Sequence, residues 1–423
     1  MSQFKITGKR PLKGSILISG AKNAALKIIP AAILGNTPSI VKNVPKIADI
    51  FKMDEILQSI GAKITFADNT FMVDPTSINS TAPEAKLVKK LRGSVVLIGP
   101  LLAKYGKATF SEPGGCLIGS RPIDDHLDLF EQFGVKINYN EKLGKYVFSG
   151  KPKAGKIVLK AMSVTATENA MMAAVLSPGI TTVHVAAAEP EIADLANFLN
   201  DMGAKITGAG THVITIEGVS SLHGAEHEVL PDRIEAGTYL ISAIAANSEV
   251  EIGPIIPDHL NLVLKKLEDA GAKFEIIVRD NKSYIKTKKH GELIAQSIDT
   301  RPYPGFPTDL QSPYAVLMTQ AKGETQIFET IFEGRFRYLE ELKLMRAEIE
   351  IQNPRTFVLN GSSKLVGTEI SSRDIRGGAA LVIAALIADG ETIINDIEYI
   401  DRGYEDMDGK LRAIGAQIER IQD

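Results

Sequence analysis

The strongest constraint on the fold is one pattern that occurs six times along this chain of 423 residues. In each copy an amphipathic, helix-like stretch ends at a turn residue and continues at once into a short segment typical of a strand. A glycine at such a turn can adopt a positive φ and end the helix. The copies are DEILQSIGAKITF (54–66), LDLFEQFGVKINY (127–139), LANFLNDMGAKIT (195–207), LVLKKLEDAGAKFEI (262–276), LEELKLMRAEIEI (339–351) and MDGKLRAIGAQIERI (407–421), with turns at Gly61, Gly134, Gly203, Gly271, Arg346 and Gly415.

A second landmark, an apolar stretch rich in small residues, lies between these copies and also occurs six times. A turn and an alternating segment follow each stretch, as in GITTVHVAA (179–187) and GETIINDI (390–397). Together the landmarks define a unit of roughly 70 residues that is close to βαβαββ and too long for an ordinary solenoid repeat. Six such units predict an α/β protein of two domains, each with three units in pseudo-threefold symmetry.

The starts of the small-residue helices carry polar and charged side chains. Ser, Thr, Asp and Asn at these positions can be simple N-caps. The cations need another explanation, because the positive end of the helix dipole disfavours them unless an anion is present. A shared polyanionic ligand would supply that anion. The side chains are Lys22, Asn23, Arg92, Ser163, Thr165, Asp232, Arg233, Thr308, Asp309, Asp374 and Arg376.

Composition excludes several classes of protein. The formal net charge of −3 provides no basic field for nucleic acid or an anionic membrane. One cysteine cannot form an internal disulfide, and the first residues, MSQFKITGKRPLKG, lack a signal-peptide core. Apolar runs end before the roughly 18 residues that a membrane-spanning helix needs. We expect a cytoplasmic protein with no nucleic-acid or membrane partner, and the scattered histidines predict no metal site.

The only cysteine lies in the segment SEPGGCLIGSRPIDDH (111–126). Its glycines and prolines favour an irregular, movable loop, which we interpret as a lid. A lone cysteine is most often an inert buried residue. Here Arg121 follows Cys116 by five residues and can favour the reactive thiolate.

At these residues the chain resembles a known family, the UDP-N-acetylglucosamine 1-carboxyvinyltransferases of bacterial peptidoglycan synthesis. The resemblance spans the whole chain. Related enolpyruvyl transferases of the shikimate pathway share the fold but differ at the Lys-Asn pair and lack the PGGC loop. The matching motifs are GAKNAAL (20–26), PGGCLIGSRPIDDH (113–126), EPEIADL (189–195), LPDRIEAGT (230–238), FPTDLQ (306–311), FEGRF (332–336), DIRGGAAL (374–381) and IDRGYE (400–405).

This resemblance implies a fold of two inverted α/β domains, each made of three βαβαββ-like units. Residues 22–229 are expected to form one domain, which holds the mobile Cys116 loop. Residues 1–21 and 230–423 are expected to form the other. The active site is expected in the cleft between the domains, and bound substrate is expected to close it.

The family reaction transfers the enolpyruvyl group of phosphoenolpyruvate to the 3′-hydroxyl of UDP-N-acetylglucosamine. The hydroxyl adds to C2 while C3 gains a proton, and phosphate then leaves. The resemblance implies no cofactor and no metal. It implies a role in cell-wall biogenesis, cell shape and cell division, and we expect a monomer.

Phosphoenolpyruvate carries a phosphate and a carboxylate, so its site needs several cations. The resemblance assigns Lys22, Arg121 and Arg402 to this task, with Arg376 in support. It also implies that Asn23 binds the sugar nucleotide and stabilises the tetrahedral intermediate. Lys22 and Arg402 are counted among the catalytic residues together with Cys116 and Asp309.

The two remaining catalytic roles are proton transfers. Asp309 corresponds to the group that hydrogen-bonds the attacking hydroxyl and acts as general base; the alternative is an N-cap of the following helix. Cys116 corresponds to the proton donor to C3, which also contacts phosphoenolpyruvate and is the target of the epoxide antibiotic fosfomycin. Arg335 and Asp374 are expected to support the site.

The resemblance also assigns residues that bind the sugar nucleotide. Three departures from the family pattern lie near this site: Thr165 replaces a common glycine, Ala161 a common lysine, and Gly334 a common asparagine. The assigned residues are Asn23, Arg92, Arg121, Pro122, Ile123, Asp124, Asp125, Ser163, Val164, Thr165, Asp309 and Ile331.

Other functions remain open at this point. One alternative is a shikimate-type enolpyruvyl transferase, and another is a non-catalytic paralogue of the same fold. An RNA 3′-phosphate cyclase-like enzyme also uses repeated α/β units, although no matching histidine motif is present. A sliding-clamp-like scaffold would not require the PGGC loop or cations at helix starts.

Overall fold

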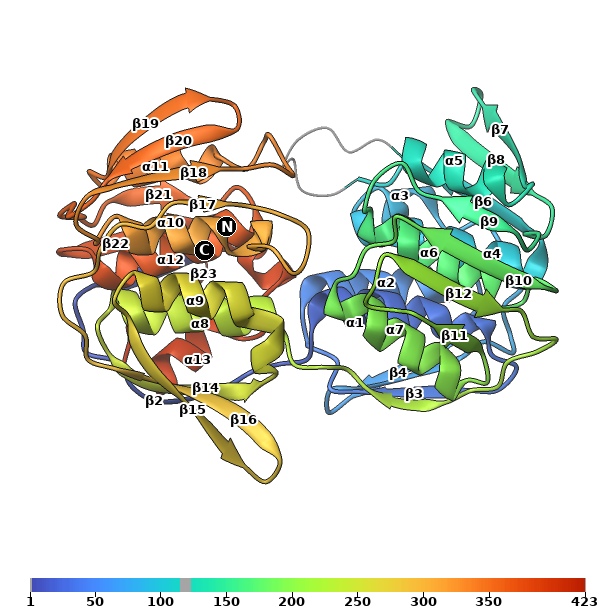
Figure 1. Ribbon diagram of the computed structural model, residues 1–423, viewed down its shortest axis with the longest axis horizontal. Coiled ribbons are helices and arrows are strands. Elements are labelled where there is room, and N and C mark those ends of the chain that lie inside the picture. The colour runs from blue at the N-terminus through green and yellow to red at the C-terminus, as the bar shows by residue number, and fades with distance from the viewer. Residues whose placement is uncertain (1, 115–122, 423) are drawn as a thin grey trace. The chain divides into compact units, whose positions relative to one another are not determined.

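A computed structural model describes residues 2–114 and 123–422 of the chain. They form two compact units, each with its own core (Figure 1). We call residues 20–114 and 123–230 the central unit, and residues 2–19 and 231–422 the C-terminal unit. Within the described ranges, no helix combines the length and the apolar character needed to cross a membrane.

The central unit contains three sheets, with strand orders β13-β3-β5-β4, β6-β8-β7 and β11-β12-β10-β9. Its helical segments are α1 (Lys22–Ala31), η1 (Ala32–Leu34), α2 (Ala48–Ser59), α3 (Ala85–Val88), η2 (Arg92–Leu97), α4 (Ile98–Tyr105), α5 (Asp124–Gln132), α6 (Val164–Ala174) and α7 (Pro190–Asp201). Its strands are β3 (Ser39–Lys42), β4 (Lys63–Ala67), β5 (Thr70–Asp74), β6 (Lys107–Ser111), β7 (Lys136–Asn140), β8 (Lys145–Ser149), β9 (Lys156–Val158), β10 (Ile180–His184), β11 (Lys205–Thr207), β12 (Val213–Glu217) and β13 (Glu226–Glu228).

The C-terminal unit also contains three sheets, with strand orders β21-β22-β1-β23, β15-β16-β14-β2 and β17-β18-β20-β19. Its helical segments are α8 (Arg233–Ala245), η3 (Pro257–Leu260), α9 (Asn261–Asp269), η4 (Thr308–Leu310), α10 (Gln311–Met318), α11 (Arg337–Leu344), α12 (Ile375–Ile387), η5 (Ile397–Arg402) and α13 (Met407–Ala413). Its strands are β1 (Ser2–Thr7), β2 (Lys13–Leu17), β14 (Glu249–Ile255), β15 (Lys273–Arg279), β16 (Lys282–Lys288), β17 (Ile298–Asp299), β18 (Glu324–Phe328), β19 (Glu348–Asn353), β20 (Thr356–Asn360), β21 (Glu369–Ser371), β22 (Glu391–Asn395) and β23 (Gln417–Gln422).

The predicted βαβαββ repeat is confirmed in both units. It is continuous in β9-α6-β10-α7-β11-β12 and in β17-α10-β18-α11-β19-β20. The first two strands of each repeat pair in parallel, and the last two form an antiparallel hairpin. A parallel pair needs a crossover connection, and in each repeat the small-residue helix provides it.

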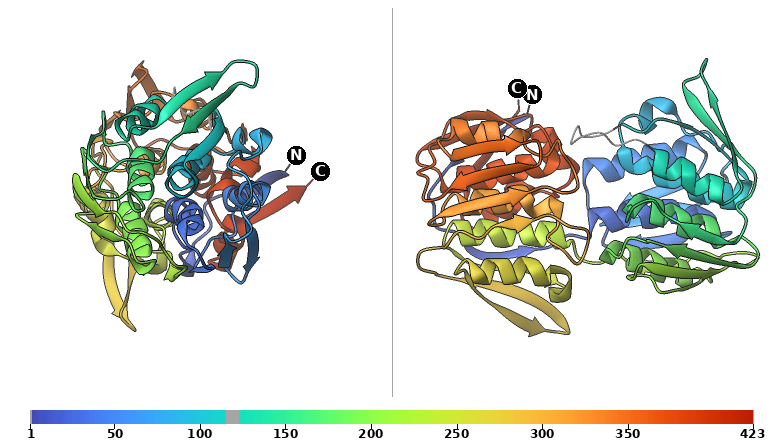
Figure 2. Two further views of the ribbon diagram at one scale, coloured as in Figure 1. Left: turned by 90° about the vertical axis from the view of Figure 1, so that its right-hand side faces the viewer. Right: turned by 45° about the horizontal axis from the view of Figure 1, so that its top comes forward.

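Three sheets are completed by strands from distant parts of the sequence. β13 pairs in parallel with β3, and β2 pairs in parallel with β14. β1 lies between β22 and β23 and is antiparallel to both, which places the two ends of the chain side by side (Figure 2). The C-terminal unit therefore depends on the first residues of the chain as well as on the last.

The small-residue helices form the interior of each unit. In the C-terminal unit, α8, α10 and α12 contact one another, and every residue of α12 is buried (Figure 1). Close packing requires small residues: a Cβ atom on Gly237 of α8 would lie 2.5 Å from Leu310 Cδ1. The absence of that atom lets α8 approach η4, the segment that carries Asp309.

The six predicted helix-ending turns are confirmed. The residues there, five glycines and Arg346, all have positive φ values, from 70° to 101°. Arg346 has the lowest of these values, 70°, and adopts a conformation that L-residues other than glycine rarely use. The repeat geometry therefore outweighs the local preference of this residue.

Candidate active site

The most distinctive cluster of the C-terminal unit is a carboxylate between two arginines. Asp309 lies in η4, and its Oδ1 accepts a hydrogen bond from Arg335 Nη2 at 2.5 Å. Its Oδ2 lies 3.0 Å from both Nε and Nη2 of Arg376. The two guanidinium groups are almost fully buried, whereas the carboxylate is 22% exposed. The structure thus joins three residues that the sequence analysis assigned to the site.

Each arginine has further contacts that fix its position. Asp374 is the N-cap of α12 and accepts hydrogen bonds from the backbone N–H groups of Arg376 and Gly377 at 3.0 and 2.9 Å. The Arg376 guanidinium lies 5.2 Å from the centroid of the Tyr404 ring. Arg335 lies at the same distance from the ring of Phe332. Cation–π contacts of this kind stabilise a charge that is removed from water.

Not every N–H group of the two guanidinium groups is used within the cluster. The arginines share the Asp309 carboxylate, and Asp374 and Asp232 place further negative charge near Arg376. Within the described ranges, Arg335 Nε and Arg376 Nη1 are buried and have no hydrogen-bond partner. Buried donors normally have partners, so this cluster is suited to an additional anion.

The alternative role of Asp309 as an N-cap is not observed. Neither η4 nor α10 begins with a hydrogen bond from a capping side chain. Asp374 and Asp232, by contrast, do cap α12 and α8. The Asp309 carboxylate is therefore committed to the two arginines.

Two other predicted residues lie in the same unit. Arg402 is the last residue of η5, which packs against α12, and it is partly exposed. Ile331 follows β18, and its backbone N–H donates to the Glu329 side chain at 2.8 Å. Both residues are therefore carried by segments that also position the arginine cluster.

In the central unit, Lys22 and Asn23 are the first residues of α1. Lys22 is buried, and its Nζ lies 3.4 Å from a carboxylate oxygen of Asp49 in α2. Lys52 lies 3.7 Å from the other oxygen of the same carboxylate. Contrary to the expectation that cations at helix starts need a ligand anion, protein carboxylates pair with Lys22 and Arg376.

The other predicted residues of this unit begin η2, α5 and α6. Arg92 opens η2 and donates to the backbone oxygen of Pro113 at 3.4 Å. Asp124 and Asp125 open α5 directly after Ile123. Ser163 is the N-cap of α6, where it accepts from the backbone N–H of Ala166, and Val164 follows it.

A buried histidine connects α5 with α6. His126 Nε2 lies 3.1 Å from Thr165 Oγ1, and its Nδ1 lies 3.1 Å from Asn169 Nδ2. Burial and, to a smaller extent, the nearby charge of Arg92 lower the pKa of His126 to about 3. The imidazole is therefore neutral at physiological pH and links the starts of the two helices through hydrogen bonds.

Cys116, Arg121 and Pro122 lie outside the residues that the structure describes. Their assigned roles, and the interpretation of their loop as a lid, remain predictions. All other residues assigned from the sequence are described. The structure brings together Asp309, Arg335, Asp374 and Arg376 in the C-terminal unit.

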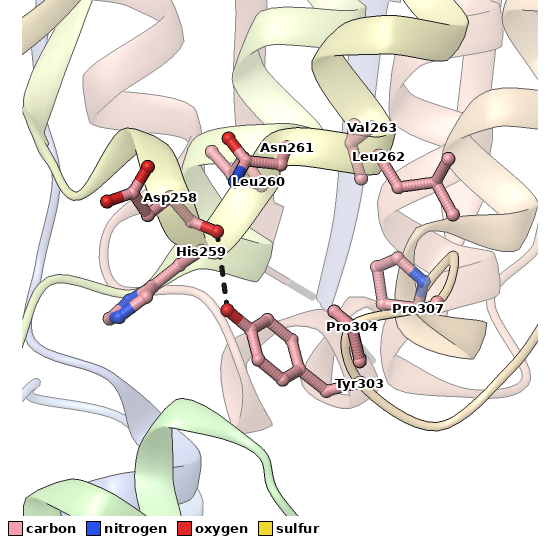
Figure 3. A pocket seen from close by; sticks show the side chains of 10 residues that line it. Asp258, His259, Leu260, Asn261, Leu262, Val263, Tyr303, Pro304 and Pro307 are labelled. Atoms are coloured by element: carbon pink, nitrogen blue, oxygen red, sulfur yellow. Dashed lines mark hydrogen bonds between the residues drawn. The ribbon is translucent and has the colours of Figure 1, made fainter. Parts of the chain in front are cut away.

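Two surface hollows lie away from these residues. One, of about 50 Å³, lies between η3, the start of α9 and the segment 303–307, where Tyr303 donates a hydrogen bond to the backbone oxygen of Asp258 at 3.3 Å (Figure 3). The other, of about 340 Å³, lies beside Lys205 on the sheet β11-β12-β10-β9 of the central unit. No residue assigned to the site lines either hollow, and the first is far smaller than the 300 Å³ or more of a typical ligand pocket.

Glu329 and Glu168 are two of the buried carboxylates that were not singled out from the sequence. Glu329 follows β18 and is fully buried. Glu168 of α6 is also fully buried, 3.5 Å from Lys27 of α1. A signal for Glu168 was present, because an acidic residue in a small-residue apolar helix is unusual, whereas Glu329 lies in no motif.

Comparisons with known proteins cover the whole chain. The sequence model of the EPSP synthase family, described as 3-phosphoshikimate 1-carboxyvinyltransferase, matches residues 6–411. The UDP-N-acetylglucosamine 1-carboxyvinyltransferase of Halothermothrix orenii is 45% identical over 422 residues, and the match covers 100% of both chains. UDP-N-acetylglucosamine 1-carboxyvinyltransferase 2 of Carboxydothermus hydrogenoformans is 46% identical, again over 100% of both chains.

This chain belongs to the UDP-N-acetylglucosamine 1-carboxyvinyltransferase family. Solved structures agree on the fold. The enolpyruvyl transferase NikO from Streptomyces tendae superimposes with a TM-score of 0.89 at 24% identity, covering 100% of this chain and 99% of that one. EPSP synthase from Acinetobacter baumannii superimposes with a TM-score of 0.75 at 16% identity, covering 100% of both chains. At these identities the likeness shows the enolpyruvyl transferase fold and nothing further.

One departure from the carboxyvinyltransferase family pattern has a structural consequence. Thr165, which stands where glycine is common, uses its hydroxyl to contact His126. A glycine would lack that hydroxyl. Ala161 is exposed and Gly334 is partly exposed, and nothing in the structure explains these two replacements.

Proposed function

We propose that this protein transfers the enolpyruvyl group of phosphoenolpyruvate to the 3′-hydroxyl of UDP-N-acetylglucosamine. The observation that carries the proposal is the 45–46% identity to enzymes of that name over the full length of the chain. The arginine-held carboxylate Asp309 supports it, because the reaction needs both a base and cations. Both substrates are small molecules, and the proposal includes no nucleic-acid or membrane partner.

The C-terminal unit provides the general base and part of the site that binds the anionic substrate. Asp309 removes the proton of the 3′-hydroxyl as the oxygen bonds to C2 of phosphoenolpyruvate. Its contacts with Arg335 and Arg376 keep the carboxylate ionised, which is the form that accepts a proton. The same contacts make it a weak base, so deprotonation has to accompany attack on the alkene. Arg402 and Arg376 bind phosphoenolpyruvate.

The residues of the central unit take the remaining roles. Lys22 and Arg121 bind phosphoenolpyruvate, and Cys116 delivers a proton to C3. Asn23 binds the sugar nucleotide. The starts of α5 and α6, together with Arg92, contact the nucleotide, and neutral His126 holds these starts together.

The two steps balance without an oxidant or a cofactor. Addition forms a C–O bond at C2 and a C–H bond at C3, which gives a tetrahedral intermediate. Elimination breaks the bond from C2 to the phosphate oxygen; the proton lost from C3 returns to the Cys116 thiolate, and the proton held by Asp309 passes to the leaving phosphate. The products are the enolpyruvyl ether and inorganic phosphate. We place this reaction in the cytoplasm, at the first committed step of peptidoglycan synthesis.

Phosphate release tests the acceptor directly. Purified protein is incubated with phosphoenolpyruvate alone, with UDP-N-acetylglucosamine, or with shikimate 3-phosphate. We expect phosphate only with the sugar nucleotide. Release only with shikimate 3-phosphate would identify the shikimate-type alternative. Folded protein that releases phosphate with neither acceptor would identify a non-catalytic paralogue.

Fosfomycin tests the role of Cys116. We expect one fosfomycin molecule to alkylate Cys116, which raises the mass of the protein by the mass of that molecule, and we expect phosphate release to stop. Cys116→Asp should remain active and resist the compound, since a carboxylic acid can replace the thiol as proton donor. A folded but inactive Cys116→Asp variant would rule out a donor role that a carboxyl group can take over.

A further inference from the structure

Glu329 is a buried carboxylate with a complete set of hydrogen-bond donors. Its exposed fraction is 0%. Oε1 accepts from Thr300 Oγ1 at 2.9 Å and from the backbone N–H groups of Ile331 and Phe332 at 2.8 and 3.1 Å. Oε2 accepts from Thr308 Oγ1 at 2.8 Å. Burial of a carboxylate is costly unless hydrogen bonds compensate it, and here four donors surround its two oxygens.

These four donors come from three separate segments of the C-terminal unit. Thr300 follows β17 and also holds Thr330, because its Oγ1 accepts the Thr330 N–H at 2.9 Å. Thr308 is the first residue of η4. Ile331 and Phe332 belong to the loop that leads from β18 to Arg335. Charge-assisted hydrogen bonds are stronger than neutral ones, so one carboxylate fixes all three segments.

Two of the segments meet again at the candidate active site. Thr308 precedes Asp309 directly, and the loop after β18 delivers Arg335, whose Nη2 reaches Asp309 at 2.5 Å. Phe332 is both a donor to Glu329 and the ring beneath Arg335. Glu329 is therefore connected to Asp309 in two ways: through Thr308, and through the loop 330–335, which carries Arg335.

We propose that Glu329 is a positioning residue, which acts through Thr308 and the loop 330–335 to hold the base Asp309 and the backbone of Ile331 in place for the sugar nucleotide. The inference rests on the proposed function for its catalytic part. Glu329 touches neither substrate in this scheme. Its effect is on the placement of Asp309, and a displacement of about 1 Å can lower a rate by up to about 100-fold.

A pair of isosteric substitutions separates positioning from general stability. Thr308→Val removes one donor to Glu329 and keeps the side-chain shape. Thr287→Val is the control: Thr287 is a fully buried threonine of β16, in another sheet than β18, and its hydroxyl donates to the Ser248 backbone oxygen at 2.6 Å and accepts from the Val250 backbone N–H at 2.9 Å. Thr308→Ser keeps the hydroxyl.

We expect both valine variants to lower Tm, and Thr287→Val to lower it more, because it also leaves the Val250 N–H without its acceptor. Thr308→Val should lower kcat for phosphate release about tenfold with little change in KM for phosphoenolpyruvate, whereas Thr287→Val keeps the wild-type kcat. Thr308→Ser should restore kcat to within about twofold. Equal kcat values for Thr308→Val and the wild type would overturn the inference.

Crystal structures test the inference without turnover. In Thr308→Val we expect Asp309 to lose its contact with Arg335, whereas in Thr287→Val the contact persists. An Asp309 carboxylate that keeps both arginine contacts in Thr308→Val would overturn the inference, whatever the acceptor substrate is. Wild-type protein that releases no phosphate would overturn only the proposed function.

Discussion

Asp309 and Arg376 are separated by 67 positions in the sequence, yet Arg376 Nε donates to Asp309 Oδ2 at 3.0 Å. Arg335 approaches the other carboxylate oxygen. A second carboxylate of the same unit also pairs with two arginines: Asp408 is buried and accepts from Arg412 at 2.8 Å and from Arg420 at 2.7 Å, although these arginines are more exposed than Arg335 and Arg376. The two clusters allow a matched comparison of a proposed catalytic carboxylate with a structural one.

Asp309→Asn should lower kcat by at least about 100-fold, because a general base contributes about 10² to 10⁴ to a rate. Asp408→Asn should leave kcat within about twofold. Both changes leave two arginines without their shared carboxylate, so both should lower Tm. Phosphate release and calorimetry measure the two effects. If Asp309→Asn keeps kcat above a tenth of the wild-type value, Asp309 is not the base.

Lys22 and Lys52 share the Asp49 carboxylate but differ in their predicted roles. Lys22→Ala should raise KM for phosphoenolpyruvate by about 10- to 100-fold, the effect of a lost hydrogen bond between charged groups. Lys52→Ala should leave KM nearly unchanged, because no substrate contact is assigned to it. Steady-state kinetics with varied phosphoenolpyruvate gives both values. Similar increases in the two variants would mean that Lys22 acts through Asp49 rather than on the substrate.

The buried carboxyl group of Glu168 should make the stability of the central unit depend on pH. Burial raises the pKa of its carboxyl group, Lys27, 3.5 Å away, opposes the rise, and the charges of Glu191 and Glu189 add to it. The resulting pKa is about 8. In the unfolded chain the pKa is near its ordinary value of 4.5. Between these values the folded state holds a proton that the unfolded state has lost. Stability therefore falls as pH rises through this window.

Glu168→Gln removes this titration. The Tm of the variant minus the Tm of the wild type should increase by several degrees from pH 5 to pH 8. Glu217→Gln is the control, because Glu217 pairs with Lys205 at the exposed surface. Scanning calorimetry at the two pH values provides the measurement. A constant Tm difference for Glu168→Gln would show that the carboxyl group is ionised throughout this range.

The helix-ending turns predict effects of different size on stability for two substitutions. Gly271 has a φ of 91°, and a Cβ atom there would meet its nearest neighbour at an ordinary 3.6 Å, so Gly271→Ala should cost about 1 to 2 kcal/mol from the backbone alone. Arg346 already bears that cost. Arg346→Gly should change the free energy of unfolding by less than about 1 kcal/mol in either direction, because relief of strain is offset by the entropy of glycine. Urea denaturation tests both, and a larger loss for Arg346→Gly than for Gly271→Ala would contradict the shared geometry.

The repeats were predictable because they depend on local preferences that recur. Apolar periodicity, a residue with positive φ and an alternating segment identified all six helix-to-strand turns. At Arg346 the register in the repeat, and not the residue type, indicated the turn. The strand β13 was not predictable in the same way, because its partner β3 lies almost 190 positions earlier.

The candidate site was predictable by residue but not by contact. The resemblance marked Asp309, Arg335 and Arg376 individually, yet nothing in the sequence indicated that both arginines hold the same carboxylate. Glu329 escaped notice because its role depends on donors from three segments that only the folded chain brings together. Lys22 was expected to await an anion, and the proximity of Asp49 could not be read from spacing alone.

The placement of β1 between β22 and β23 has a consequence for synthesis on the ribosome. A chain is made from its N-terminus, so residues 2–7 wait unpaired until residues 391–422 have emerged. The central unit, which lies between them in the sequence, is complete much earlier and can begin to fold while its partner unit is still being translated. A truncation that removes only β23 would leave one edge of β1 without a neighbouring strand. An open strand edge of this kind favours association with other chains.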